Sequence, residues 1–162
     1  MRHGVRLGID VGSVRVGVAT CDPSGLLASP VETVPRDVTQ RSDLQRIAKL
    51  VAEYSAIEVV IGAPTSLSGL QGPAFEAAHA YAVAVSQSIG PVPVRMVDER
   101  FSTVTAHRTL SEAGVKGRRR RPVVDQAAAV VILQAALDAE RVSGRPPGTL
   151  ISQGESDDAL GE

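Results

Sequence analysis

The first twenty residues contain two apolar, β-branched segments, residues 5–12 and 14–20, which are joined directly at Gly12-Ser13. A link this short cannot carry a crossover connection, so the two segments are expected to form an antiparallel hairpin. Asp10 lies inside the first segment, between apolar neighbours. A carboxylate in that position is costly to desolvate unless an arginine, a set of hydrogen-bond donors or a metal meets it. The hairpin therefore restricts the fold, and Asp10 requires a partner.

Three glycines surround Asp10 in this hairpin, namely Gly8, Gly12 and Gly17. Glycines inside strands mark places where a ligand or another backbone approaches closely. We therefore expect such an approach beside Asp10.

The rest of the chain predicts one more strand and then alternating helices and strands. We expect a third strand over 26–34, helices over 39–54, 73–89, 102–113 and 122–142, and buried strands over 57–61 and 92–97. Three antiparallel strands followed by strand–helix alternation give an α/β fold. Its mixed five-stranded sheet, three antiparallel strands and then two parallel ones, is flanked by helices. Ligands of such sheets gather beyond the carboxyl ends of the parallel strands.

The length of 162 residues suits one domain, which we assign to residues 1–142. Residues 143–162 lack periodicity and end in small, polar and acidic residues, so we expect a disordered acidic tail. No apolar run approaches the ~20 residues of a membrane span, and no secretory leader is recognisable, so no membrane partner is expected. The single cysteine, Cys21, suits a reducing compartment, so we expect a cytoplasmic protein.

The formal net charge of −1 hides a basic cluster. Lys116 and Arg118 to Arg121 are interrupted only by Gly117. Such a cluster suits a polyanion, while a solvated loop without a partner is the alternative. Because the chain has two Tyr, two Phe and no Trp, contacts to nucleic acid would go mainly to the phosphate backbone.

Acidic residues interrupt the apolar patterns at three places that could converge. Asp10 lies in the first strand, Asp98-Glu99 close the last buried strand, and Asp125 lies in the first turn of the last predicted helix. Carboxylates drawn together from distant sequence repel one another, so such clusters usually hold divalent cations. Magnesium suits an oxygen-only site, and metal ions can activate water without a histidine or serine nucleophile.

Each acid also has a simpler explanation. Asp125 could complement the helix dipole. Asp98-Glu99 could be a solvated strand end that pairs with Arg100. Asp10 is the hardest to explain as a structural residue alone, because it lies among apolar strand residues.

Four motifs in order resemble those of one known family. They are Gly8–Ala19, Gly62-Ala63-Pro64 with Gly69 and Gly72, Val97–Thr103, and Asp125–Gln134. Over about residues 5–140 the chain resembles the YqgF (RuvX) family of Holliday-junction-resolvase-like, pre-16S ribosomal RNA nucleases with an RNase H-like fold. One departure is Ala63, where the family often has leucine.

The resemblance implies a Mg²⁺- or Mn²⁺-dependent endonuclease that matures the 5′ end of pre-16S rRNA. Asp10, Glu99 and Asp125 would then be the catalytic metal ligands, with Asp98 sharing the duty of Glu99. Nucleic-acid contacts would fall to Arg100, Thr103, Lys116, Arg118, Arg119, Arg120 and Arg121. Structured RNA, branched DNA and ribosomal precursor particles are the implied partners, bound by a monomer or a homodimer.

Three other functions stay open at this point. Resolution of Holliday junctions on DNA would call for a dimer. A ribosome-assembly factor could bind nucleic acid without catalysis, using the basic cluster alone. Finally, Asp10-Val11-Gly12-Ser13 with Gly17 also resembles the first phosphate motif of the actin and sugar-kinase ATPases. Those proteins close two such domains around ATP, whereas 162 residues supply one.

Overall fold

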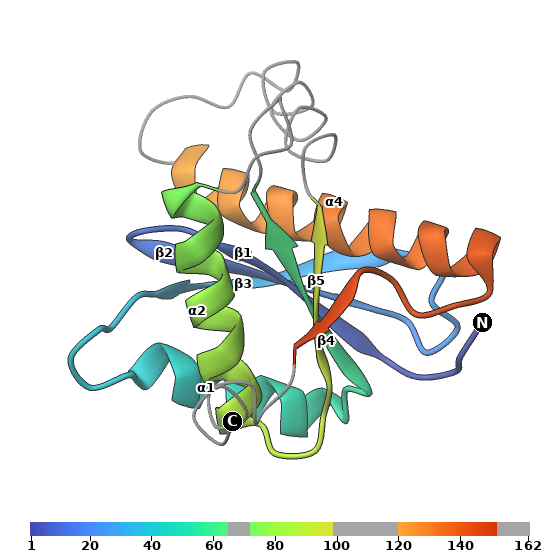
Figure 1. Cartoon of the computed structure of the whole chain (residues 1–162), viewed down its shortest axis with the longest axis horizontal. Helices are drawn as coiled ribbons and strands as arrows, with labels where there is room; N and C mark the ends of the chain where they lie inside the picture. The colour runs from blue at the N-terminus through green and yellow to red at the C-terminus, as the bar shows by residue number, and fades with distance from the viewer. Residues whose placement is uncertain (65–71, 99–119, 152–162) are drawn as a thin grey trace, which may run out of the picture.

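The computed structural model describes residues 1–64, 72–98 and 120–151, with side chains in the last range described from Asp125 onward (Figure 1). Its elements are β1 (Arg6–Val11), β2 (Arg15–Cys21), β3 (Ala28–Pro35), α1 (Ser42–Tyr54), β4 (Glu58–Ala63), α2 (Pro73–Ser88), β5 (Val94–Asp98), α4 (Arg120–Ser143) and β6 (Thr149–Ile151). No helix in these ranges is both long and apolar enough to cross a membrane.

The strands form one mixed sheet in the order β3-β2-β1-β4-β5-β6. β1, β2 and β3 pair antiparallel, while β4 lies parallel to β1 and β5 parallel to β4. This confirms the predicted α/β class and the predicted hairpin. The described sheet has six strands where five were expected, because Thr149–Ile151, which we assigned to a disordered tail, pairs antiparallel with β5.

Helices cover both faces of the sheet (Figure 1). Leu7 and Ile9 of β1 belong to the larger apolar core, which also contains residues of α1 and α2. Val60 of β4 packs instead in a second cluster with residues of α4. Because strand side chains alternate between faces, Asp10 faces the α4 side, next in sequence to Ile9 on the opposite side.

Helix α4 begins at Arg120, two residues before the predicted start at Pro122. Asp125 is therefore the sixth residue of the helix, and the first turn contains no acidic residue. Our placement of Asp125 in the first turn was wrong. The helix-dipole explanation weakens accordingly, because that effect is confined to the terminal turn.

Helix α1 begins at Ser42 instead of residue 39, because a compact turn precedes it. The Asp37 carboxylate accepts hydrogen bonds from the backbone N–H of Gln40 (3.0 Å) and from the Ser42 hydroxyl (2.7 Å). Arg41, directly before the helix, has a φ of 60°. That left-handed conformation is uncommon for a side chain of this size.

A buried ion network joins the chain start to the sheet and to α4. Glu140 accepts hydrogen bonds from Arg2 (2.6 Å) and Arg6 (3.2 Å). Glu58 pairs with Arg2 and Arg95, each at 3.1 Å. Arg6 is 1% exposed and Glu140 is 2% exposed. Hydrogen bonding from Arg2 lowers the pKa of Glu140 to about 2.

Candidate functional site

Helix α4 lies directly against two glycines of the hairpin. A Cβ at Gly17 would overlap the backbone oxygen of Asp125, and one at Gly8 would lie 2.6 Å from the Cβ of Leu133. The close approach that the glycines predicted is therefore made by a backbone of the chain itself. This contact holds α4 at Asp125 against Gly17 of β2.

This packing brings two predicted acids together. Asp10 is the register partner of Gly17 in the β1–β2 ladder, and partners in such ladders have Cα atoms about 4.5–5.5 Å apart. Since Asp125 lies on Gly17, it lies beside Asp10 on the α4 side of the sheet. Burial, and secondarily the charge of Asp125, raises the pKa of Asp10 to about 6.

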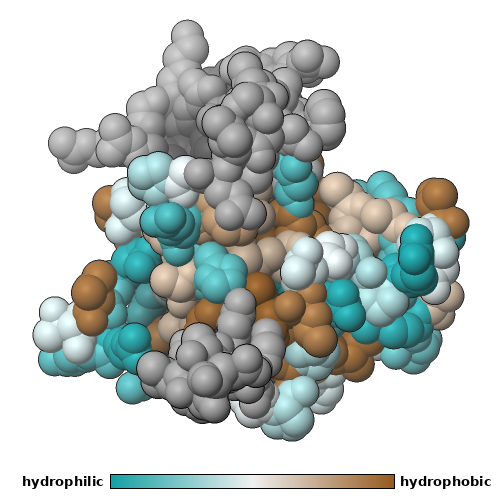
Figure 2. All heavy atoms as spheres, viewed as in Figure 1, coloured by the Kyte–Doolittle hydropathy of each residue, from teal (hydrophilic) through white to brown (hydrophobic). Residues whose placement is uncertain are grey.

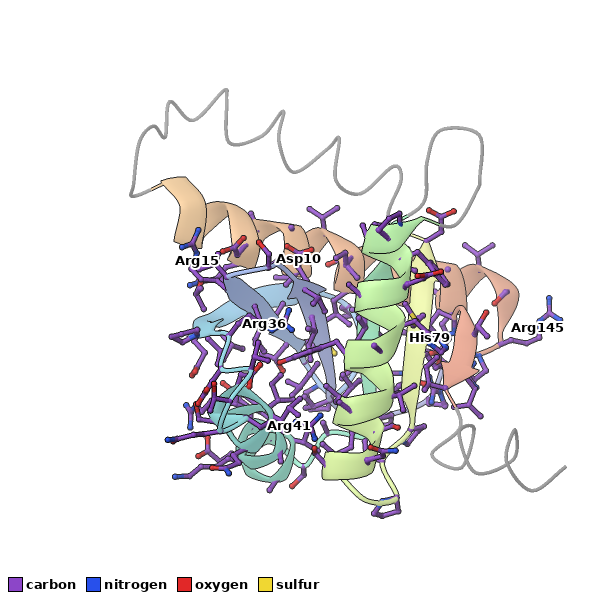
Figure 3. The ribbon with its side chains drawn as sticks, turned by 60° about the vertical axis from the view of Figure 1, so that its left-hand side comes forward. Asp10, Arg15, Arg36, Arg41, His79 and Arg145 are labelled. Carbon is purple, nitrogen blue, oxygen red and sulfur yellow. The ribbon has the colours of Figure 1, made fainter. Side chains whose placement is uncertain are left out.

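Arg15 places a positive charge beside Asp125. Its Nε donates to Oδ2 of Asp125 at 3.1 Å, with the two side chains 31% and 19% exposed. Figure 3 shows Arg15 and Asp10 near the same end of α4. Asp125 is thereby oriented by an arginine, whereas Asp10 is the acid with the strongly raised pKa.

Two converging carboxylates of this kind can hold a divalent cation, because hard dications prefer oxygen ligands and relieve the repulsion between them. Within the described ranges no three His, Cys, Asp or Glu side chains gather closely enough to hold a metal ion. The predicted third acid, Glu99, lies outside the described residues.

The other predicted site residues are placed only in part. Asp98 is exposed at the end of β5 and borders a cavity of about 190 Å³ together with Ala136 and Gly148. Arg120 and Arg121 begin α4. Outside the described residues are Arg100, Thr103, Lys116, Arg118 and Arg119, whose predicted contacts stay predictions.

Two arginines of the site region were missed by sequence reasoning. The sequence pattern could have identified Arg15, because it starts the second strand of the hairpin and strand alternation places its side chain on the same face as Gly17. No such pattern points to Arg36. Its NH1 donates to the carbonyl oxygen of Gly12 at 2.8 Å, and so holds the end of the hairpin that carries Asp10.

We expect Gly17→Ala to lower the free energy of unfolding by about 1–3 kcal/mol, because α4 must move away from β2 to admit the methyl group. Urea unfolding followed by circular dichroism measures this change. Gly72→Ala is the matched control, since a Cβ there meets no atom of the described residues within 4 Å. Equal stability of Gly17→Ala and the wild type would contradict the close packing described above.

Comparison with known proteins gives one family. A model described as "RuvX: Holliday junction resolvase" matches residues 4–139. A Streptomyces coelicolor protein is 57% identical over 149 residues, which are 91% of this chain and 88% of that protein. A Thermobifida fusca protein is 53% identical in an alignment 158 positions long that covers 93% of this chain and 98% of that protein. Both carry the name "Putative pre-16S rRNA nuclease".

Solved structures with the same fold include two of RuvC. The structure "T. thermophilus RuvC in complex with Holliday junction substrate" aligns with a TM-score of 0.60 and 17% identity, over 90% of this chain and 99% of that one. "Thermus thermophilus RuvC structure" aligns with a TM-score of 0.53 and 14% identity, over 88% and 99%. At these identities the likeness concerns the fold alone, and it confirms the expected RNase H-like architecture.

Proposed function

Because this chain belongs to the RuvX family, we propose that it is the endonuclease that matures the 5′ end of pre-16S rRNA. The family and its named relatives make the chain a hydrolase of phosphodiester bonds. The site assignment rests on the closeness of Asp10 and Asp125, which lie side by side because α4 packs against Gly17. The pKa of Asp10 is raised to about 6 in this position. The family assignment leaves the ATPase interpretation and the purely non-catalytic factor without support.

We propose Asp10, Asp125 and Glu99 as the metal ligands, with Asp98, the residue before Glu99, sharing its duty. Asp98 ends β5 and borders the same cavity as Ala136 of α4. The choice of Glu99 rests on the resemblance of Asp98-Glu99-Arg100 to the family motif.

The donor set fits Mg²⁺ or Mn²⁺, since it consists of carboxylates, and the pKa of Asp10 is raised first by burial and then by the negative charge of Asp125. A bound ion of this type polarises a phosphoryl oxygen and lowers the pKa of water. In the chain itself, Asp10 supplies a half-buried carboxylate that is ionised above about pH 6. Arg15 holds Asp125 in orientation at 3.1 Å and limits the net negative charge that a phosphate must approach.

We propose that the basic residues identified in the sequence bind the nucleic-acid substrate. Arg100 and Thr103 would contact phosphates near the cut. The cluster of Lys116 and Arg118 to Arg121 would hold the flanking backbone through counterion release. The division into a domain over 1–142 and a tail, and a cytoplasmic location, likewise stay predictions.

Cleavage of two substrates tests the proposed function. Purified protein is incubated with a 16S rRNA precursor fragment carrying its 5′ leader, and separately with a four-way DNA junction, each with Mg²⁺, Mn²⁺ or EDTA. We expect metal-dependent cleavage of the RNA at its mature 5′ end. Cleavage of the junction alone, by a dimer in light scattering, would favour the resolvase instead. Equal cleavage in EDTA would overturn the metal assignment.

Metal affinity should depend on pH through Asp10. Because the pKa of Asp10 is about 6, protonation competes with metal binding below that pH. We expect the apparent Mn²⁺ affinity to fall by about tenfold per pH unit below 6, and to be nearly constant from 7 to 8. Isothermal titration calorimetry across pH 5–8 measures this, and an affinity that is flat down to pH 5 would remove Asp10 from the ligand set.

A further inference from the structure

A second cavity, lined by both charged and apolar side chains, lies on the sheet face opposite α4. It measures about 290 Å³ and is bounded by the turn between β3 and α1 on one side and by α2 on the other. Figure 3 shows Arg41 beside α1, with Arg36 between Arg41 and Asp10. Figure 2 shows hydrophilic and hydrophobic residues interleaved on this face. None of the roles proposed above uses this cavity.

The two carboxylates of the cavity are already engaged. Asp37 accepts from the backbone of the turn and from the Ser42 hydroxyl. Asp43 is 3% exposed and accepts a hydrogen bond from the Tyr81 hydroxyl at 2.9 Å. Its Oδ2 also lies 3.5 Å from Nε of Arg36. Neither acid is therefore a free ligand for a cation.

The arginines differ in how they are held. Arg36 is anchored, because it bonds the Gly12 carbonyl and its guanidinium carbon lies 4.7 Å from the centre of the Tyr81 ring. The Arg41 side chain is exposed, and it makes no hydrogen bond or ion pair among the described residues. Its backbone is nevertheless fixed at a φ of 60° by the turn. The cavity thus contains the planar guanidinium of Arg36, which stacks on Tyr81, and the guanidinium of Arg41, which is available to bind an anion.

The size and charge of the cavity indicate which ligand it can bind. A volume near 290 Å³ is at the lower end of the range for small-molecule pockets and suits a single nucleoside, not a duplex. Ala77, Ala80 and Ala84 of α2 give the cavity an apolar wall. The formal charges of its two arginines and two aspartates cancel, which disfavours inorganic phosphate as the main ligand. A flat base with one attached phosphate matches all three properties.

We propose that this cavity binds one unpaired nucleotide of the nucleic-acid substrate. The base packs against the alanines and the guanidinium of Arg36, and its phosphate is bound by Arg41. Unstacked bases of RNA are commonly held in this way on aromatic rings and arginine planes. One such pocket also agrees with the low aromatic content, because it needs no run of stacking rings. This inference rests on the proposed nuclease function.

The position of the cavity supports a role next to the cut. Arg36 bonds Gly12, which is two residues, or roughly 7 Å, beyond Asp10 along β1. The cavity and the carboxylates therefore lie on opposite sides of the hairpin end. A strand that passes around this end would reach the cavity within a few nucleotides of the scissile bond.

Equilibrium binding tests the proposal without requiring cleavage. Fluorescence anisotropy in EDTA is recorded with a labelled, single-stranded RNA spanning the mature 5′ end of 16S rRNA, and with copies that carry one abasic nucleotide at successive positions. The variants are Arg41→Ala and Ala80→Leu, the second filling the cavity. Their matched controls are Arg145→Ala, another exposed arginine, and Ala52→Leu, an exposed alanine of α1.

We expect both cavity variants to weaken binding by about tenfold, and the controls by less than twofold. When the abasic nucleotide is the one that the cavity binds, we expect the wild type to bind this RNA about tenfold more weakly than the intact RNA. The two cavity variants should bind the abasic and the intact RNA equally well. Wild-type affinity in both variants would overturn the proposal, and so would variant effects that no abasic position reproduces. Equally effective competition by a free nucleoside 5′-monophosphate would overturn it in favour of a free ligand. Because EDTA prevents metal-dependent cleavage, a failure here is distinct from a failure of the nuclease assignment.

Discussion

Asp10→Asn is expected to lower RNA cleavage by about a thousandfold or more while making the folded protein more stable at pH 7. The loss follows from the removal of a ligand whose metal contributes several kcal/mol to the barrier, at 1.36 kcal/mol per factor of ten. The gain follows from the pKa of Asp10, which is about 6 instead of the ordinary 3.8. The carboxylate is thus ionised at neutral pH at the expense of folding.

The direction of the pH effect follows from proton binding. Between about pH 4 and 6 the folded state holds a proton on Asp10 that the unfolded chain has released, so wild-type stability falls as pH rises through this window. A shift of about two pKa units corresponds to roughly 2–3 kcal/mol, an upper value for a partly accessible group. Asparagine removes this dependence, so the two stability curves should separate as pH rises from about 4 to 6 and stay apart by a constant amount above pH 6.

Urea unfolding at pH 4.5 and 7.5 in EDTA, together with RNA cleavage in Mn²⁺, measures both effects. Glu76→Gln, at an exposed acid in the first turn of α2, is the control; it should leave cleavage unchanged and lower stability by less than about 1 kcal/mol. An Asp10→Asn protein that cleaves normally would exclude Asp10 from catalysis. One that is inactive and less stable would mean that Asp10 acts in folding instead.

Glu140→Ala is expected to lower the free energy of unfolding by about 3–5 kcal/mol, which is the usual cost of leaving a buried ionic partner uncompensated. The uncompensated group is Arg6, 1% exposed, whose NH2 donates to Glu140 at 3.2 Å. Arg2 loses its 2.6 Å contact as well. The network lies far along α4 from Asp125, so the residual folded protein should retain its metal affinity.

Asp138→Ala provides a matched control on the same helix. Its side chain is 56% exposed and pairs with Arg141 at 2.9 Å, and exposed pairs of this kind contribute about 0–1 kcal/mol. The pH dependence adds a second readout. Because the pKa of Glu140 is lowered to about 2 from 4.5, its stabilisation is complete above pH 4.5 and is lost as pH falls toward 2. The Glu140→Ala protein should lack that acid-sensitive component.

Local sequence was sufficient to predict the hairpin, the acid inside its first strand and the close approach at its glycines. A carboxylate between Ile9 and Val11 is unusual in any strand, and a strand glycine such as Gly17 has few explanations besides close approach. The contact of Arg15 with Asp125 was not predictable in the same way. It joins residues 110 positions apart and depends on the seating of α4, which the sequence pattern does not fix.

The sixth strand was missed for a related reason. Thr149–Ile151 is too short for a periodic signal, and it becomes a strand by pairing with the border of β5. Arg36 was missed because its partner, the Gly12 carbonyl, is a backbone group that leaves no trace in composition. The role of Glu99 and of the basic cluster stays a prediction, since Glu99 and most of that cluster lie outside the described residues.

The outermost strands of the described sheet bear on self-association. At one border lies β6, which is three residues long, and at the other lies β3, which contains Pro30 and Pro35 and so lacks two backbone donors. Short and proline-bearing borders are poor templates for strand addition from a second molecule. Amyloid-like growth from the native state is thereby disfavoured, and two copies meeting on branched DNA would have to associate through helices or loops.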